Sequence, residues 1–181
     1  MDDHFDVMTK LLLLRHGKSS WQRPFINDID RPLNRRGHCA SKKIAKYIYE
    51  LGFLPDFILC SPARRTRETL GHVTPAFAHE YRILLEPKLY SGGAIELLDC
   101  LLSIGDGCNS AMLIGHNPGI SELSNLILNT GPRDQVHSIK RKFPTGGLAV
   151  FNFNVPWSDL GPASADLQQF VLPKSLKSND S

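Results

Sequence analysis

Short runs of apolar residues alternate along this chain with longer segments in which apolar residues recur at the spacing of a helix. The first run, residues 10–15 (KLLLLR), has four consecutive leucines, which is typical of a strand buried on both faces of a sheet. Five further strands are predicted at residues 57–60, 81–86, 110–115, 148–153 and 167–172.

Two helices are predicted from their end signals. Asn34 has the side chain of an N-cap, and Gly52 stops the apolar helical face that follows it. Ser61 and Pro62 predict the start of a second helix, because serine caps helices and proline favours the first helical position. That helix is expected to run to about Gly71.

Further helices are predicted over residues 95–102 and about 120–128. The basic run Lys140–Lys142 is interpreted as a solvated loop, or alternatively as an edge that attracts anionic partners. Strands that alternate with helices predict an α/β fold, here a three-layer α/β/α sandwich with a mostly parallel central sheet.

The chain has 181 residues, of which 41% are apolar and 22% charged, so we expect one globular domain over residues 1–181, with a core of about 10–172 and flexible tails. A net charge of +3 is too small to indicate a nucleic-acid partner, and the apolar runs are too short for a membrane span. Residues 1–6 lack the apolar core of a secretory signal, so a cytoplasmic location is expected. Met8 is a second candidate for the natural start.

The four cysteines form no CxxC pair, and no histidine stands at zinc-ligand spacing from them, so no metal or other cofactor is expected. Reduced thiols fit the expected cytosol. Cys60 ends an apolar run and is predicted in the core, whereas Cys108 lies in a polar loop and is predicted to be exposed.

Residues suited to phosphate follow three of the predicted strands. Arg15 and His16 follow the first strand, Arg65 lies just after the second, and His116 follows the fourth. Each alone is more often a loop histidine or a solvated arginine. Because ligands bind at the carboxyl ends of parallel strands, and two helices are predicted to begin there, the combination predicts a phosphate site.

Several short sequence motifs give more specific information about the family. They are RHGKSSW (15–21), DRPLNRRG (30–37), SPARRTRET (61–69), GHNPG (115–119) and FPTGGLAV (143–150). Together they resemble the histidine phosphatase superfamily, and most of all its SixA-type phosphohistidine phosphatases. The resemblance covers about residues 10–172 and implies a phosphoglycerate mutase-like fold.

The resemblance also implies catalytic roles. His16 matches the nucleophile that becomes phosphorylated, Arg15 and Arg65 match the two phosphate-binding arginines, and His116 matches the second histidine. Arg64 is expected to be a surface residue. Relatives that cleave alcohol phosphates carry an acidic general acid at a position that falls here at Pro87, next to Glu86.

These groups predict a metal-independent mechanism. If a backbone carbonyl accepts one N–H of His16, the other ring nitrogen can attack phosphorus, while Arg15, Arg65 and a protonated His116 hold the phosphate oxygens. The phosphorylated histidine is then hydrolysed by water. A site weak in general acid fits phosphohistidine, because imidazole leaves more easily than an alcohol.

The short connections leave little room for a lid, so an open pocket and a phosphorylated protein of the histidine phosphotransfer type are expected. A small-molecule phosphomonoesterase of the same superfamily is the main alternative, and a non-catalytic phosphate-binding module is less favoured because His16 is intact. Trp21 is expected either to flank the pocket or to pack locally. Lys18, Ser19 and Asn117 are candidates to reach the substrate.

Overall fold

One mixed sheet organises the protein, for which a computed structural model describes residues 8–22, 25–77, 79–105 and 107–176. Residues 1–6, where no secretory signal was predicted, lie outside these ranges. The strands are β1 (Thr9–Arg15), β2 (Phe57–Cys60), β3 (Arg82–Leu85), β4 (Ser110–Gly115), β5 (Leu148–Phe153) and β6 (Asp166–Val171). They lie in the order β3-β2-β4-β1-β5-β6. All six predicted strands are therefore confirmed, with ends shifted by one residue at most.

The central strands β1, β2 and β4 run parallel, as does β3 at the edge, and β5 runs antiparallel to β1. The register places Arg15 opposite Gly115 and Cys60 opposite Ile114. The carboxyl ends of β1, β2 and β4 therefore meet at one edge. This confirms the mostly parallel sheet, and the residues predicted to bind phosphate follow the strands that end at this edge.

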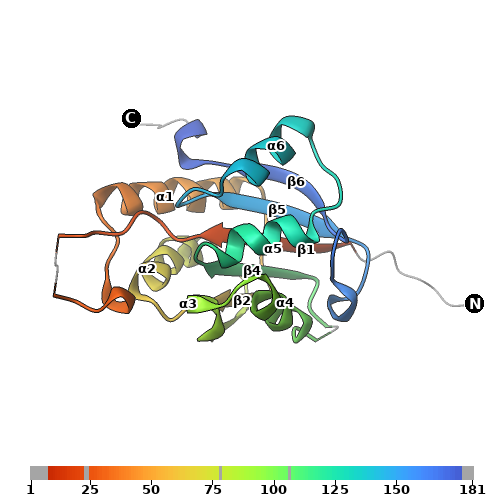
Figure 1. Cartoon of the computed structure of the whole chain (residues 1–181), viewed down its shortest axis with the longest axis horizontal. Coiled ribbons are helices and arrows are strands. Elements are labelled where there is room, and N and C mark those ends of the chain that lie inside the picture. Colours follow the sequence, from red (N-terminus) through yellow and green to blue (C-terminus); the bar gives the residue numbers. More distant parts are fainter. Residues whose placement is uncertain (1–7, 23–24, 78, 106, 177–181) are drawn as a thin grey trace, which may run out of the picture.

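Helices cover both faces of the sheet, which confirms the three-layer sandwich (Figure 1). They are α1 (Arg35–Glu50), α2 (Arg64–Val73), α3 (Lys88–Ser91), α4 (Ala94–Leu102), α5 (Gly119–Ile127) and α6 (Arg133–Arg141). The pair α1 and α2 packs on one face, and α4, α5 and α6 pack on the other. In the described part of the chain, no helix is long and apolar enough to cross a membrane.

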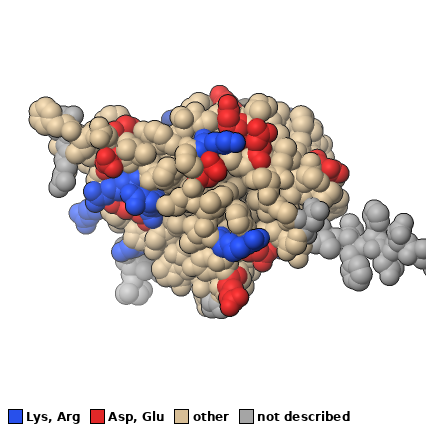
Figure 2. All heavy atoms as spheres, turned by 90° about the horizontal axis from the view of Figure 1, so that it is seen from below, with Lys and Arg blue, Asp and Glu red and all other residues tan. Residues whose placement is uncertain are grey.

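Charged side chains are spread unevenly over the surface. Figure 2 shows a compact group of lysine and arginine side chains at the end of the molecule where, in Figure 1, the loop between β1 and α1 projects. Some acidic side chains lie among them. The small net charge therefore conceals a local excess of cations at one end.

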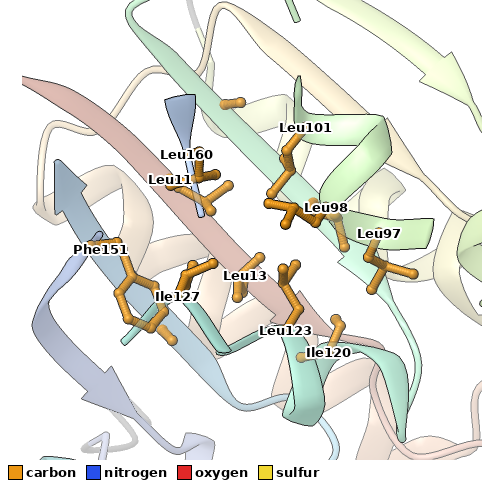
Figure 3. Close-up of a cluster of buried hydrophobic side chains, with 14 of the residues drawn as sticks. Leu11, Leu13, Leu97, Leu98, Leu101, Ile120, Leu123, Ile127, Phe151 and Leu160 are labelled. Carbon is orange, nitrogen blue, oxygen red and sulfur yellow. The ribbon is translucent and has the colours of Figure 1, made fainter. Parts of the chain in front are cut away.

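The core consists of two apolar layers, and the alternation of side chains along β1 assigns its leucines to both. Leu11 and Leu13 pack with residues of α4 and α5 on one face, including Leu101 and Leu123 (Figure 3). Leu12 and Leu14 belong to the other layer, with apolar residues of α1 and α2. All four leucines are buried, which is why the strand reads as a continuous apolar run.

Three local predictions are wrong. The second helix begins at Arg64, because Ser61 and Pro62 remain in the preceding loop. Lys140 and Arg141 end α6, which was not predicted because a single residue of that helix is buried. Cys108 is also buried rather than exposed, since the indole of Trp157 packs in the same core and donates a hydrogen bond to its carbonyl oxygen.

The start of α1 is fixed against the loop that follows β1. The side chain of Asn34 accepts a hydrogen bond from Gly37 N at 2.9 Å, which confirms the predicted cap. A Cβ atom on Gly37 would lie 2.2 Å from the carbonyl oxygen of Lys18. The helix and the loop therefore approach each other through backbone atoms.

We predict that Gly37→Ala lowers the free energy of unfolding by about 1–3 kcal/mol, because the added methyl group clashes with main chain that cannot rotate away. Gly71→Ala in α2 is the matched control, since nothing lies within 4 Å of the added atom. That variant should gain about 0.5–1 kcal/mol from helix propensity. Urea unfolding of both variants measures the difference, and equal stability would contradict the close approach.

Candidate active site

The loops after three parallel strands meet in one pocket. His16 N donates to Gly115 O at 3.2 Å, and Ser61 N donates to Ile114 O at 3.0 Å, so the strand ladder continues into the loops. The rings of His16 and His116 have centroids 4.8 Å apart. The pocket has a volume of about 740 Å³ and is lined by Arg15, His16, Lys18, Ser19, Trp21, Asp28, Arg31, Arg65, Tyr90, Ser91, His116, Asn117, Lys142, Pro144 and Thr145.

The ring of His16 is held by its own backbone. Nδ1 lies 2.6 Å from Gly17 O, and because a carbonyl only accepts, the proton sits on Nδ1 and the lone pair on Nε2. Burial and the neighbouring guanidinium groups of Arg65 and Arg15 together lower the pKa of His16 from 6.5 to about 4, although the hydrogen bond to Gly17 O opposes this shift. A neutral ring at neutral pH is therefore the state that the surroundings favour.

A single carboxylate organises the cations of the pocket. Asp28 Oδ2 accepts hydrogen bonds from Arg65 Nη2 at 2.9 Å and from the Tyr90 hydroxyl at 2.8 Å. Its Oδ1 accepts from Arg31 Nη1 at 2.6 Å. Arg65 Nη1 donates to the Asp28 carbonyl oxygen as well, at 2.6 Å. Arg65 is thus fixed at both ends of its guanidinium fork.

The pKa of Asp28 reflects this arrangement. Burial alone raises the pKa of the carboxyl group, but the hydrogen bonds from Tyr90, Arg31 and Arg65 lower it more, to well below its usual value. Burial and the contact with Asp28 raise the pKa of Tyr90. At neutral pH the carboxylate is ionised and the phenol keeps its proton.

Arg31 ties the loop after β1 to the pocket wall. Its Nη2 donates to Ser19 Oγ at 2.5 Å and its Nε donates to Ser20 O at 3.2 Å. Its guanidinium carbon lies 3.2 Å from the centroid of the Trp21 ring, a cation–π contact. Trp21 is 77% exposed, so it flanks the pocket and stacks on Arg31 at the same time.

Arg15 is anchored on the opposite wall. Its Nη1 donates to Phe143 O at 2.8 Å, and Asn117 Nδ2 donates to the same oxygen at 3.1 Å. Its Nε is buried and has no hydrogen-bond partner among the described residues. Since buried donors are nearly always paired, a free N–H at this place suits an anionic ligand.

The surroundings of His116 disfavour the protonated state that the expected mechanism assigns to it. Burial, together with the neighbouring His16 and Arg65, lowers its pKa from 6.5 to about 3, so these surroundings favour the neutral ring. Its Nε2 is hydrogen-bonded to Ser61 Oγ at 2.8 Å, and its buried Nδ1 has no partner among the described residues. Protonation of His116 beside Arg15 and Arg65 would require a bound anion.

The four predicted site residues lie together in this pocket. Lys18, Ser19, Trp21 and Asn117 line it too. Arg64 points elsewhere and pairs with Glu68 at 2.7 Å. Glu86 does not line the pocket, because its Oε1 accepts a hydrogen bond from Lys88 N at the start of α3.

Among the pocket residues that sequence reasoning missed are the three that form the hydrogen-bond network with Arg65: Asp28, Arg31 and Tyr90. Arg31 lies within the motif DRPLNRRG, which could have indicated it as a site residue. Asp28 lies outside every quoted motif, and its partner Arg65 is 37 residues away in the chain. Tyr90 lies outside the quoted motifs as well. No local pattern marks the last two.

Comparisons with known proteins identify similar sequences and structures. The signature of the histidine phosphatase superfamily (branch 1) matches residues 11–90. An uncharacterised protein of Mycobacterium leprae is 31% identical over 89% of this chain and its own full length.

Two solved structures share the fold, and both proteins are assigned as a phosphohistidine phosphatase SixA. The one from Agrobacterium tumefaciens is 30% identical with a TM-score of 0.75, over 91% of this chain and 98% of its own. The one from Nakamurella multipartitia is 25% identical with a TM-score of 0.77, over 92% of this chain and 96% of its own.

The lowered pKa of His16 predicts a pH-dependent stability. Because the unfolded chain binds this proton at pH 6.5 and the folded protein only at about pH 4, stability falls as the pH drops through that window. Wild type should lose about 2 kcal/mol more than His16→Gln between pH 7 and pH 5. Urea unfolding at the two pH values tests this, and parallel losses would show that His16 titrates normally.

Proposed function

The chain belongs to the histidine phosphatase superfamily as a SixA-type phosphatase, and we propose that it hydrolyses phosphohistidine through a covalent intermediate on His16. The substrate is a phosphorylated protein of the histidine phosphotransfer type. The proposed catalytic residues are His16, Arg15, Arg65 and His116. The following steps derive the role of each from its surroundings.

The first step is attack by His16. The lone pair on Nε2 forms a bond to phosphorus, and the bond from phosphorus to the substrate imidazole breaks. The electron pair of that bond returns to the substrate ring, which leaves as neutral imidazole when its other nitrogen carries a proton. Water then attacks phosphorus, the bond to Nε2 breaks, and orthophosphate is released. His16 returns to its starting state.

The arginines hold the oxygens of the transferred group. Guanidinium groups match phosphate geometry, and the free Nε–H of Arg15 is a donor that needs an acceptor. If the Ser61 hydroxyl donates to Nε2 of His116, the proton of the neutral ring sits on Nδ1 and is available to a phosphate oxygen. His116 therefore need not be charged to take part.

The protonation states of Asp28 and Tyr90 support imidazole as the leaving group. Asp28 is the one carboxylate among the described residues that line the pocket, and three hydrogen bonds keep it ionised. Tyr90 holds its proton more tightly than a free phenol. Neither group supplies the proton that a departing alcohol needs. A departing imidazole needs no such donor, because its pKa lies near neutral pH.

A protein substrate fits the form of the pocket. Lys18, Trp21 and Lys142 line its rim and are exposed, so a phosphorylated side chain on another protein has access. We also propose a cytoplasmic location, because all four cysteines are free thiols, as a reducing compartment would keep them.

Two other functions compete with this proposal. A small-molecule phosphomonoesterase would fit the volume of the pocket, but it needs a general acid that the ionised Asp28 does not provide. A phosphate-binding module without turnover would not require the arrangement of His16, whose proton is fixed on Nδ1 and whose Nε2 is left to attack.

Arg65→Ala should lower kcat/KM by about 2–4 kcal/mol in transition-state stabilisation, since the guanidinium would contact the oxygens where charge develops. Arg64→Ala is the matched control from the same helix turn, and its loss should be much smaller because Arg64 pairs with Glu68. Steady-state kinetics on one phosphohistidine peptide measures both. Equal losses would place the wrong arginine in the site.

The leaving group provides the main test of the proposed function. We predict that wild type strongly prefers a phosphohistidine peptide to an alkyl phosphate monoester in kcat/KM. Glu86→Gln should change hydrolysis of the peptide by less than roughly tenfold, against the 10²–10⁴ that a general acid contributes. His16→Ala should abolish both activities and serves as the control for the covalent step.

A preference for the alkyl ester that Glu86→Gln removes would overturn the proposal in favour of a small-molecule phosphatase with Glu86 as its acid. Substantial activity in His16→Ala would instead contradict the covalent mechanism alone. The two results separate the identity of the substrate from the identity of the nucleophile.

A further inference from the structure

A second cleft opens beside the catalytic pocket. It has a volume of about 490 Å³ and is lined by Lys18, Arg36, Ala40, Ser138, Arg141, Lys142, Pro144, Thr145, Leu172, Pro173 and Lys174. Four of these residues, Lys18, Lys142, Pro144 and Thr145, also line the catalytic pocket. The two hollows are therefore adjacent, and a protein surface that covers one lies beside the other.

The lining of this cleft is strongly cationic. Lys18, Arg36, Arg141, Lys142 and Lys174 are all exposed, and no acidic side chain stands among the described residues that line the cleft. Within the described ranges none of the five forms an ion pair, whereas Lys46 and Arg64 on the neighbouring helix surfaces do. Their charge is available to a ligand.

The fold assembles these cations from separate elements. Lys18 lies in the loop after β1, Arg36 in the first turn of α1, Arg141 at the end of α6, and Lys174 in the turn after β6. The burial of Ile139 and Phe143 anchors the end of α6, while Arg141 and Lys142 remain exposed. Arg141 and Lys142 thus form a charged wall of the cleft on a fixed support.

A third hollow shares Lys18 and Arg36 with this cleft and is also lined by Arg35. Positive charge therefore extends from the catalytic pocket over more than one neighbouring hollow. A small substrate with two phosphates needs one compact second site. A protein surface that displays several carboxylates can contact a broad cationic area.

We propose that this second cleft binds aspartate or glutamate side chains of the phosphorylated protein while its phosphohistidine occupies the catalytic pocket. The inference rests on the proposed function and names the surface chemistry of its substrate. Guanidinium forks pair with carboxylates in two-point contacts, and a positive patch steers an acidic partner during encounter. The cleft then confers selectivity for acidic surroundings of the phosphohistidine.

Two double variants test the cleft without touching the catalytic pocket. Arg36→Glu with Arg141→Glu reverses two charges in the cleft. Lys42→Glu with Lys140→Glu makes the same change in net charge on the same two helices, at exposed positions that do not line the cleft. The substrates are a phosphohistidine peptide flanked by glutamates, the same peptide flanked by glutamines, and free phosphohistidine.

The cleft variant should lower kcat/KM for the glutamate peptide by about tenfold or more at low salt, mainly through KM, and the loss should shrink as salt is added. Hydrolysis of the glutamine peptide and of free phosphohistidine should change by less than about twofold, because the catalytic pocket is intact. The control variant should stay close to wild type with all three substrates.

Three results would overturn the cleft as a carboxylate site. Equal losses in the two double variants would indicate only long-range charge, and equal rates for the glutamate and glutamine peptides in wild type would indicate no selectivity. A loss of inorganic pyrophosphate binding with unchanged peptide kinetics would assign the cleft to a second phosphate of a small substrate.

A binding measurement separates this inference from the proposed function. The glutamate peptide with an unphosphorylated histidine is titrated into each protein by calorimetry, which requires no turnover. If wild type hydrolyses neither phosphohistidine peptide, the proposed function fails, and weaker binding to the cleft variant alone still supports the cleft. If hydrolysis occurs but binding is the same in all three proteins, the cleft fails alone.

Discussion

Two guanidinium groups and a phenol share one carboxylate, and the form of the pocket depends on this sharing. Arg31 and Arg65 come from separate segments and would repel each other beside the additional charge of Arg15. Asp28 supplies the counter-charge that lets them stand close together, and it is partly exposed, so its ionised form is hydrated as well as hydrogen-bonded. Positive potential can therefore surround His16 without destabilising the loops that carry it.

Burial, with the same positive potential added to it, favours the neutral state of His16 and of His116. Each is a buried residue at the carboxyl end of a parallel strand, and each has cations for neighbours. Burial and like charge act in the same direction on an imidazole. A nucleophile that keeps its lone pair over a wide pH range follows from the architecture, with no dedicated base to remove a proton.

The sequence allowed the sheet to be predicted, because strands buried on both faces are continuous apolar runs, as Leu11–Leu14 illustrates. Residues adjacent to strand ends, such as His16, could be placed for the same reason. Asp28 could not, since its importance lies in partners that only the folded chain brings near. Helix α6 was not predicted, because it buries only Ile139. The neutral state of His116 was not predicted either, because it depends on burial, which no motif encodes.

The acceptor that fixes the His16 ring is a main-chain carbonyl, and this has an evolutionary consequence. Every residue has a carbonyl oxygen, so no side-chain replacement elsewhere can delete the group that selects the tautomer. Gly17 itself is constrained, because a Cβ atom there would lie 2.8 Å from both Gly37 O and Ser41 Oγ. The hydrogen bond between His116 and the Ser61 hydroxyl depends on a side chain, so a single substitution of Ser61 can abolish it. The two histidines therefore differ in mutational robustness, and His116 is the one whose environment can diverge as substrates change.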